Sequence, residues 1–468
     1  MMIKSQIIET PKRKTGSFNN LFKTIGKSLS YGDWATKLTF FIMGFGCFCK
    51  KQFAKGILYF LSQVAFIFIC IFFISKFLPN FGSLGTVPMK KVWDEIEQVY
   101  INVQVDNSML ILLYSLISIL IILVFAFLYL SSLKSAWTAQ ENIKNGIKNK
   151  TFLQDIKALL DEKYHTTLLS LPSIGVIIFT VLPLIYMILI GFTNFDSDHQ
   201  PPAHVFDWVG LDNFKTLLSG SAPISKTFGK VLLWTLVWAV FATFSNYFLG
   251  MFLAMIINKK GIKLKKFWRT MFVITIAVPQ FVSLLTISRM LAETGLINTW
   301  LEALNIIEKP LPFLTQGWLA RIVIIIVNIW VGIPYTLLIV TGILMNIPQT
   351  LYDSARIDGA SAFKMFIKIT FPYVFFVTAP YLLTQFIGNI NNFNVIFYMT
   401  GGGPASLNYF QAGETDLLIT WLYDLTVTFS DYNIASVIGI MVFVICAGFS
   451  LIAYNLTASA KREEDYQA

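Results

Sequence analysis

The chain has 468 residues, of which 55% are hydrophobic and only 13% are charged, about half the charged fraction of a typical soluble protein. This composition excludes a set of soluble globular domains and favours a bundle of membrane-spanning helices. The net charge of +10 is usual for a membrane protein with basic cytoplasmic loops, and without a basic-aromatic module it does not indicate nucleic-acid binding.

The amino-terminal region 1–55 is basic and polar, and its one apolar stretch, 38–48, is too short to span a bilayer. No cleavable signal peptide is evident, so the first long apolar segment is expected to remain as an anchor. The cysteines lack the spacing of zinc ligands and are predicted to be ordinary thiols; they are Cys47, Cys49, Cys70 and Cys446.

Eight segments are long and apolar enough to cross about 30 Å of hydrocarbon, and they must be helices because backbone groups in lipid bond internally. They are residues 57–74, 109–130, 168–192, 231–257, 270–288, 322–345, 373–399 and 434–454. With the amino terminus in the cytoplasm, the inner loops carry 27 Lys and Arg residues and the outer loops carry 6. The sequence therefore predicts an all-α polytopic membrane protein with both termini in the cytoplasm.

The order of these segments predicts five regions. They are a basic cytoplasmic region (1–55), two transmembrane helices (56–133), a cytoplasmic connector (134–167), a six-helix core (168–457) and a cytoplasmic tail (458–468). The connector has apolar residues at helical spacing and is predicted to lie on the membrane surface. Pro183, Pro279 and Pro334 fall within spans and predict kinks, which either line a path or are merely packed.

The cytoplasmic loop 346–372 is predicted to form two short helices around Gly359, because glycine permits a tight bend between helices. Pro348 is predicted to open the first helix, where a missing N–H costs little, and Pro372 to end the second. A compact pair of helices that projects into the cytoplasm indicates a docking element.

This loop resembles the coupling loop of bacterial ABC-importer permeases, whose pattern is Glu-Ala-Ala, three residues, Gly, nine residues, Ile, one residue, Leu-Pro. Here the same spacing appears as Asp353-Ser354-Ala355, then Gly359, Ile369 and Phe371-Pro372, with Asp, Ser and Phe in place of Glu, Ala and Leu. The resemblance implies a type I ABC importer permease fold and a loop that fits a cleft on a separate ATPase subunit. The residues it assigns to this coupling are Asp353, Ser354, Ala355, Asp358, Gly359 and Pro372.

ATP hydrolysis by the chain itself is not predicted. The nearest match to a phosphate-binding loop, residues 220–227, lacks the second glycine that wraps backbone N–H groups around phosphates, and it falls on the outer face. We therefore expect a transport subunit that is not an enzyme and that binds no cofactor or metal. ATP and Mg are expected on partner subunits.

The seventh span is the most polar, with Gln385, Asn389, Asn391, Asn392 and Asn394. On one continuous helix at about 100° per residue, Gln385, Asn389 and Asn392 share a face, and Asn394 points to the opposite side. Such amides either bond to neighbouring helices or form a ladder of donors and acceptors for sugar hydroxyls. We favour the second interpretation, a substrate path.

The middles of the spans contain no Lys, Arg, Asp or Glu, which favours a neutral polyhydroxyl substrate over a phosphate, a carboxylate, an amino acid or a metal ion. From about residue 168 to the end, the chain resembles the larger permease subunits of maltose and maltodextrin transporters, most closely around residues 386–404 and 413–418. In that family the sugar touches spans six and seven. The resemblance implies substrate contacts at Gly332, Tyr335, Gln385, Asn389, Asn392 and Asn394. Gly332 is expected to let a sugar ring approach the backbone.

The resemblance also implies a bacterial cell-membrane assembly. It has a second permease subunit, two copies of an ABC ATPase and an extracellular sugar-binding protein, here expected to be a lipoprotein because the outer loop 193–230 is short. Maltose or maltodextrin is the first candidate substrate, another neutral oligosaccharide such as a galacto-oligosaccharide is the second, and glycerol phosphate is a weaker rival. An ion-coupled secondary transporter would need ionisable residues at mid-membrane or broken helices in two halves of the chain, and neither is evident in the sequence. A membrane enzyme would need a catalytic cluster, yet His165, His199 and His204 lie outside the spans.

Overall fold

The computed structural model describes residues 17–88, 91–94, 98–102, 106–259 and 261–456. Residues 1–16 of the predicted amino-terminal region and the predicted tail 458–468 lie outside the described residues. By its contacts the chain divides into two compact units: residues 1–189 with 199–208, and residues 190–198 with 209–468.

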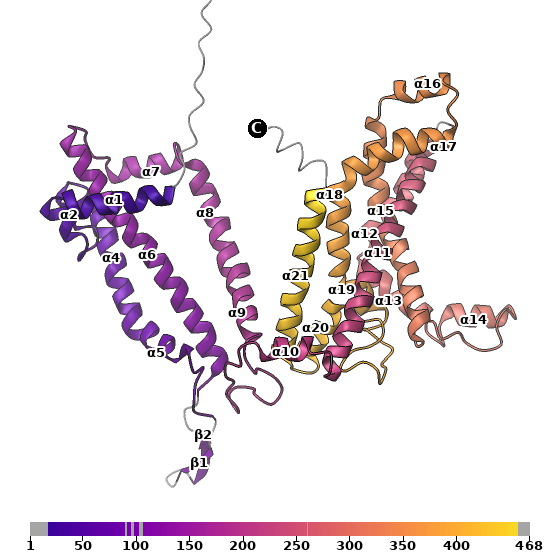
Figure 1. Ribbon diagram of the computed structural model, residues 1–468, viewed down its shortest axis with the longest axis horizontal. Helices are drawn as coiled ribbons and strands as arrows, with labels where there is room; N and C mark the ends of the chain where they lie inside the picture. The colour runs from indigo at the N-terminus through magenta and orange to yellow at the C-terminus, as the bar shows by residue number, and fades with distance from the viewer. Residues whose placement is uncertain (1–16, 89–90, 95–97, 103–105, 260, 457–468) are drawn as a thin grey trace, which may run out of the picture. The chain divides into compact units, whose positions relative to one another are not determined.

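The first unit has long apolar helices with a layer of crosswise helices at one end and a small hairpin at the other (Figure 1). Its elements are α1 (Ser17–Tyr31), α2 (Trp34–Leu38), α3 (Phe45–Cys49), α4 (Phe53–Ile69), η1 (Cys70–Ile74), α5 (Ser75–Phe77), η2 (Leu78–Phe81), β1 (Lys91–Asp94), β2 (Val99–Asn102), α6 (Ser108–Lys144), α7 (Phe152–Leu160), α8 (Tyr164–Val176), η3 (Ile177–Val181) and α9 (Leu182–Ile190).

Local sequence explains where these elements begin and end. Asn107 caps α6 because its side chain accepts a hydrogen bond from the N–H of Leu110, 3.2 Å away. Along α6 many of the buried residues are small, such as Ser115, Ser132 and Ala136, and small residues let membrane helices approach closely. The strands β1 and β2 form an antiparallel hairpin in which Lys91 lies opposite Asn102. This hairpin is a local departure from the predicted all-α fold.

The second unit is helical, with α16 at one end of its long helices and α10, α14 and α20 at the other (Figure 1). Its elements are α10 (Asp212–Leu218), α11 (Pro223–Asn258), α12 (Lys265–Ala277), α13 (Gln280–Met290), α14 (Leu296–Ala303), α15 (Gly317–Asn346), α16 (Gln349–Ile357), α17 (Ala362–Met365), η4 (Phe366–Thr370), α18 (Phe371–Ile390), α19 (Phe393–Met399), α20 (Leu418–Val427) and α21 (Tyr432–Leu456).

The helix α11 is the centre of the second unit, because it packs along α15 and also contacts α18. Its side chains join three buried clusters in turn, through Phe228, Trp238 and Tyr247. A Cβ atom on Gly250 would lie 2.7 Å from the Cβ of Thr336, so glycine is needed where α11 meets α15. Since lipid is as apolar as these side chains, close packing rather than exclusion of water holds the helices together.

Among the described residues, seven helices are long and apolar enough to span a membrane, and a bent pair brings the number to eight. These correspond to the eight predicted spans, so the predicted helical membrane fold is confirmed. The fifth span is the bent pair, α12 and α13, which meet at 90° beside Pro279 as the proline predicted. Pro334 lies inside the unbroken α15. The third span has its contacts in the first unit, and its assignment to a core at 168–457 stays a prediction.

Candidate functional site

A pocket of about 160 Å³ lies beside the bend between α12 and α13 in the second unit. Its polar and aromatic lining includes Gln280, Ser283, Trp330 and Tyr335. The side chain of Asn394, from α19, donates a hydrogen bond to Oε1 of Gln280 over 3.1 Å. The structure therefore brings two of the predicted path residues, Tyr335 and Asn394, close to one bend, and Gln280 joins them.

A second, more apolar hollow of about 570 Å³ adjoins this pocket. Three residues line both cavities, namely Val278, Ser283 and Trp330. The two cavities share this wall along α13 and α15, and we call them together the bend hollow. Aromatic rings next to neutral amides and hydroxyls are suited to a sugar, because rings pack against its apolar face and amides bond to its hydroxyls.

The predicted stripe of amides along one continuous helix is wrong. The helix α18 ends at Ile390 and α19 begins at Phe393, so Asn389 and Asn392 lie on either side of a break. Asn392 accepts a hydrogen bond from the N–H of Val395 and caps α19, a role that asparagine favours. Angular positions calculated across residues 391 and 392 therefore do not hold.

Asn389 forms hydrogen bonds to a neighbouring helix, which is the alternative to a substrate contact for the amides of span seven. Its side chain is buried and donates to Oγ1 of Thr243 on α11, 3.0 Å away, and its backbone oxygen accepts from the indole of Trp238. The amide of Asn392 donates to Oδ1 of Asn389 over 3.3 Å. Gln385 is exposed on α18. A direct contact of these residues with substrate stays a prediction.

Gly332 does not leave the open approach to the backbone that was expected for a sugar ring. The space is filled by Asn246 of α11, since a Cβ atom on Gly332 would lie 2.0 Å from Nδ2 of that residue. The glycine thus allows α11 and α15 to pack, with a polar side chain between them. The Oδ1 atom of Asn246 is buried and has no hydrogen-bond partner among the described residues.

The loop between spans six and seven has the predicted form of two short helices around a glycine. The helix α16 ends in a turn where Gly359 has φ of +75°, in the left-handed region that glycine favours. In that turn the N–H of Ala360 donates to the backbone oxygen of Ala355 over 2.9 Å. Ser361 then caps α17 by accepting from the N–H of Lys364. We call residues 346–372 the coupling loop.

One expectation for this loop is wrong, because Pro372 does not end the second helix. The chain continues from α17 through the π-helical η4 into α18, and Pro372 occupies the first turn of α18. A proline is tolerated there because the wider π turn leaves a backbone donor unused. The second helix of the loop is therefore the beginning of span seven itself, because helical structure continues from Ala362 to Ile390, where α18 ends at the break before α19.

The other residues assigned to coupling lie on or beside α16 and face outward to different extents. Asp353 is about half exposed and forms an ion pair with Arg356 at 3.1 Å. Ser354 and Asp358 are exposed, and Ala355 is partly buried. The phenol of Tyr352 bonds to Oγ1 of Thr370 over 2.8 Å and ties α16 to η4. The tip of the loop thus presents polar groups together with exposed apolar side chains, since Ile357 and Phe363 are 87% and 74% exposed.

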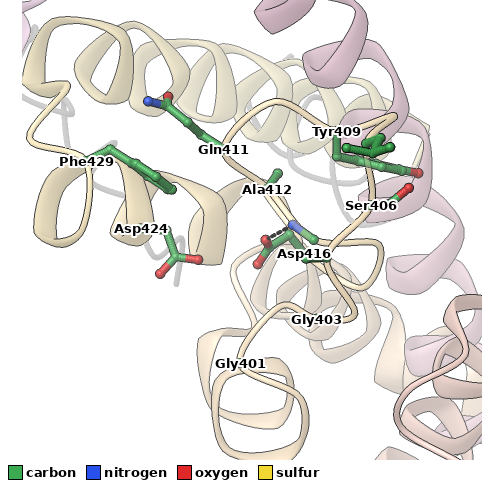
Figure 2. Close-up of a pocket in the computed structure, with 12 residues that line it drawn as sticks. Gly401, Gly403, Ser406, Tyr409, Gln411, Ala412, Asp416, Asp424 and Phe429 are labelled. Carbon is green, nitrogen blue, oxygen red and sulfur yellow. Dashed lines mark hydrogen bonds between the residues drawn. The ribbon is translucent and has the colours of Figure 1, made fainter. Parts of the chain in front are cut away.

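A third hollow, of about 450 Å³, lies at the end of the second unit opposite α16, within the loop 401–417 and beside α20. Figure 2 shows Asp416 among the residues that line it, next to Gly403 and Ala412. The carboxylate of Asp416 is 1% exposed and accepts hydrogen bonds from the N–H of Gly413 and from Oγ1 of Thr420, each at 2.8 Å. Burial raises the pKa of Asp416 to about 7.

Basic and aromatic residues hold the same loop against the long helices. Arg321 of α15 donates to the backbone oxygen of Glu414 at 2.8 Å and to the phenol of Tyr409 at 3.0 Å. Its guanidinium also lies 4.7 Å from the ring centre of Trp234, a cation–π contact. Residues 413–418 contribute to the family resemblance of the sequence, but the sequence alone assigns no role to Asp416.

Comparison with known proteins was decisive for the family. Residues 246–462 match the family described as "Binding-protein-dependent transport system inner membrane component". The chain is also 35% identical over 425 residues to the maltodextrin transport system permease protein MalC of Streptococcus pneumoniae serotype 4, with 88% of this chain and 93% of that protein covered. The chain belongs to this family of transport components.

A second relative of this permease is the galactooligosaccharides transport system permease protein GanP of Bacillus subtilis, 34% identical over 90% of this chain and 97% of that protein. A solved bacterial alginate ABC transporter, in complex with a periplasmic protein that carries an alginate pentasaccharide, shares the fold with a TM-score of 0.53 and 21% identity, covering 65% of this chain and 96% of that one. The permease is therefore a multi-pass protein of the bacterial plasma membrane that works in a binding-protein-dependent system.

Sequence reasoning about the permease missed Gln280, Trp330 and Thr243. Gln280 had a usable signal, because it is an amide in an apolar span directly after Pro279, which already predicted a kink. Trp330 lies beside the predicted Gly332 and Tyr335 but has no polar signature of its own. Thr243 could be found only from the three-dimensional contact with Asn389.

Proposed function

We propose that the chain is the larger permease subunit of an ATP-driven importer of neutral oligosaccharides, with maltose or maltodextrin as the first candidate substrate. The observation that carries this proposal is the coupling loop, in which α17 continues through η4 into α18 without a break. A partner that moves this loop would move span seven with it, as in rigid-body transmission between subunits. Asn394 and its bond to Gln280 lie on and beside that span.

The bend hollow supports a neutral substrate. Its polar groups include the amide of Gln280 and the hydroxyls of Thr275, Ser283 and Tyr335, and its rings are those of Trp330 and Tyr335. The middles of the spans have no Lys, Arg, Asp or Glu, whereas a phosphate would need a cation or a helix amino terminus. Relatives with similar sequences are named for maltodextrin and for galactooligosaccharides. A galacto-oligosaccharide is therefore the second candidate, and glycerol phosphate is disfavoured.

Within this proposal the predicted residues have different roles. Tyr335 and Trp330 pack against sugar rings, and the Gln280–Asn394 pair bonds to hydroxyls. Gln385 is exposed and stays a candidate for direct contact. Asn389, Asn392 and Gly332 act on the path indirectly, by holding the break in span seven and the packing of α11 on α15.

The partners in the proposal are a second permease subunit, two copies of an ABC ATPase and an extracellular sugar-binding lipoprotein. In this proposal ATP and Mg belong to the ATPases, and this chain is a transport subunit. The residues proposed to contact the ATPase are Asp353, Ser354, Ala355, Asp358 and Gly359. Pro372, also assigned to coupling, lies in the first turn of α18. An ion-coupled transporter would instead need ionisable groups among the central spans.

The direct test is transport by the complete complex in proteoliposomes with ATP on the cytoplasmic side. Labelled maltotriose, a galacto-trisaccharide and glycerol 3-phosphate are offered in turn with the binding protein. We expect ATP-dependent uptake of a neutral trisaccharide, and we expect Gly359→Pro to abolish uptake while the binding protein still loads sugar. Uptake driven by an ion gradient without ATP would refute the proposal, as would transport of glycerol 3-phosphate alone.

A further inference from the structure

The first unit carries a layer of helices at one end of its spans, built from two segments far apart in sequence. Residues 17–55 contribute α1, α2 and α3, and residues 145–163 contribute α7. Figure 1 shows α1 and α7 lying crosswise to the long helices α4 and α6. We call these two segments together the crosswise platform. Both segments belong to loops that the charge pattern places in the cytoplasm.

Hydrogen bonds and an ion pair join the two segments of the platform. The amide of Asn149 donates to the backbone oxygen of Lys50 at 3.5 Å, and the amide of Gln52 donates to the backbone oxygen of Lys150 at 3.1 Å. Lys55 pairs with Asp155 of α7 at 3.5 Å. The platform is thus one folded element, and its exposed side chains have fixed positions.

The interior of the platform is equally well defined. The ammonium of Lys50 is buried and bonds to the carboxylate of Asp33, 3.0 Å away, and to the hydroxyl of Thr36. Gly44 has φ of +81°, and a Cβ atom there would lie 2.3 Å from the backbone oxygen of Gly56 on α4. The loop before α3 therefore packs directly onto the first span.

This loop reaches well along the spans. The amide of Gln63 on α4 donates to the backbone oxygen of Phe41 at 2.9 Å, and the phenol of Tyr129 on α6 donates to that of Phe40 at 2.9 Å. Gln63 lies ten residues into α4, which is roughly 15 Å along the helix. Phe41 is nevertheless 77% exposed in the chain. Since the apolar span predicted at 57–74 begins six residues before Gln63, this loop lies beside a part of α4 that is predicted to be in lipid.

Exposed apolar side chains occur elsewhere on the platform as well. Tyr31 and Trp34 are 76% and 70% exposed. The helix α7 has no buried residue, and its apolar positions Leu153, Ile156 and Leu160 recur at helical spacing. A capping box of Thr151 and Gln154 fixes the start of α7, so this apolar stripe is preformed. Amphipathic helices with such stripes lie in the plane of the membrane interface.

The platform carries a net positive charge, which favours lipids with anionic headgroups. Residues 17–55 carry six lysines against the single acid Asp33. Lys50 is used internally and Lys55 pairs with α7, which leaves Lys23, Lys27, Lys37 and Lys51, all exposed and without an ion pair among the described residues. Four free ammonium groups beside exposed aromatic rings match the boundary between anionic headgroups and acyl chains.

We propose that the crosswise platform is a binding surface for anionic phospholipid, with the loop at Phe41 inserted beside the acyl chains and the four free lysines bound to headgroup phosphates. The surface would fix the first unit in the cytoplasmic leaflet independently of the transported substrate. A soluble protein partner is the other occupant that an apolar surface could take. The depth of Phe41 along α4 favours lipid.

The first experiment measures lipid retained by the full chain purified from membranes that contain phosphatidylglycerol and phosphatidylcholine. Native mass spectrometry compares the wild type with the variant Lys23→Gln, Lys27→Gln, Lys37→Gln, Lys51→Gln. Each lysine near an anionic surface contributes about fivefold in binding, so we expect retained phosphatidylglycerol to fall by at least about tenfold. The control Lys259→Gln, Lys263→Gln, Lys266→Gln, Lys368→Gln has the same charge change in the second unit and should retain it. Equal retention by both variants would overturn the proposal.

The second experiment tests depth in nanodiscs that contain phosphatidylglycerol, above the background labelling of the wild type. A charged, membrane-impermeant maleimide is offered to the cysteine introduced by Phe41→Cys and, as a control, by Asn145→Cys in the exposed turn after α6. We expect rapid labelling at position 145 and labelling at position 41 only after detergent is added. Rapid labelling at both positions would show a water-exposed surface and would overturn the proposal in favour of a protein-binding face.

Discussion

The phenol oxygen of Tyr352 lies 2.8 Å from Oγ1 of Thr370, and this hydrogen bond links α16 to the π-helical segment that begins span seven. Thr370 is buried, so the bond is shielded from water. Because α17, η4 and α18 are continuous, it is a direct connection from the tip of the coupling loop to the break at Asn391.

We expect Tyr352→Phe to weaken coupling without preventing assembly. The lost hydrogen bond is worth about 1 kcal/mol to the link between α16 and η4. The amount of sugar transported per ATP hydrolysed should therefore fall by roughly fivefold in proteoliposomes. Tyr373→Phe is the matched control, since Tyr373 lies nearby in α18 and its ring is partly exposed. An unchanged ratio of transport to hydrolysis in Tyr352→Phe would show that this bond does not transmit movement.

Gly359 is required for its backbone conformation rather than for space. It has φ of +75°, and a Cβ atom there would have no heavy atom within 4 Å. Alanine in the left-handed region costs about 1–2 kcal/mol, and asparagine tolerates that region better. We therefore expect transport to decrease in the order wild type, Gly359→Asn, Gly359→Ala.

The control for this series is Gly342→Ala. Gly342 lies inside α15, where a Cβ atom also meets nothing within 4 Å, and alanine favours a helix interior. Its transport should match the wild type. If Gly359→Ala and Gly359→Asn transported equally well, the left-handed turn would not be the property that matters.

The sequence was sufficient for the spans and the coupling loop because both depend on local properties. Apolar length defines a membrane helix, and a glycine between two short helical segments defines the bend. The predicted stripe of amides does not include the break in span seven, because it assumes that residues 391 and 392 are helical. Asparagine is a preferred capping residue, and Asn392 does cap α19, so the run of asparagines itself carried the signal.

Other features could not be predicted because they depend on which residues meet across helices. Gly332 was expected to admit a sugar ring, and nothing local shows that Asn246 of α11 fills that space. Asn389 was one of several amides, and only its contact with Thr243 separates it from Asn394, which bonds to Gln280. The bend at Pro279 was predicted, yet the hollow beside it also needs Trp330 and Tyr335 from α15.

Substitution of Asn389 and of Gln280 by alanine should therefore have different effects, one on stability and the other on sugar affinity. Asn389 is buried with its side chain bonded to Thr243, so Asn389→Ala should lower the free energy of unfolding by about 1–3 kcal/mol. Gln280 lines the bend hollow, so Gln280→Ala should leave thermal stability nearly unchanged and reduce the apparent affinity for sugar by about tenfold or less. Thermal unfolding in detergent and concentration-dependent uptake measure the two effects.

The opposite pattern of effects would change the roles proposed for Asn389 and Gln280. If Asn389→Ala kept full stability while losing sugar affinity, Asn389 would contact substrate directly. Thr243→Val provides a second check, because it removes the partner of Asn389 from α11 and should reproduce the loss of stability.

Asp416 predicts a pH dependence of stability in the loop 401–417. Burial raises its pKa from 3.8 to about 7, so the folded protein holds this proton more tightly than the unfolded chain does. The contribution of Asp416 to the free energy of unfolding is therefore highest below about pH 4 and falls as the pH rises towards 7. Asp416→Asn cannot ionise, and its amide can still accept from Gly413 and donate to Thr420.

We expect Asp416→Asn to be more stable than the wild type at pH 8, by roughly 1–4 kcal/mol, and to show little difference at pH 4. Melting temperatures of the purified chain between pH 4 and 8 measure this, with Asp358→Asn in the exposed turn after α16 as the control. Asp416 borders the hollow beside α20, yet its side chain is only 1% exposed and Gly402 packs against its Oδ1 atom, so the charged carboxylate is poorly solvated. A variant that was destabilised equally at every pH would mean that the carboxylate acts through its hydrogen bonds and not through its proton.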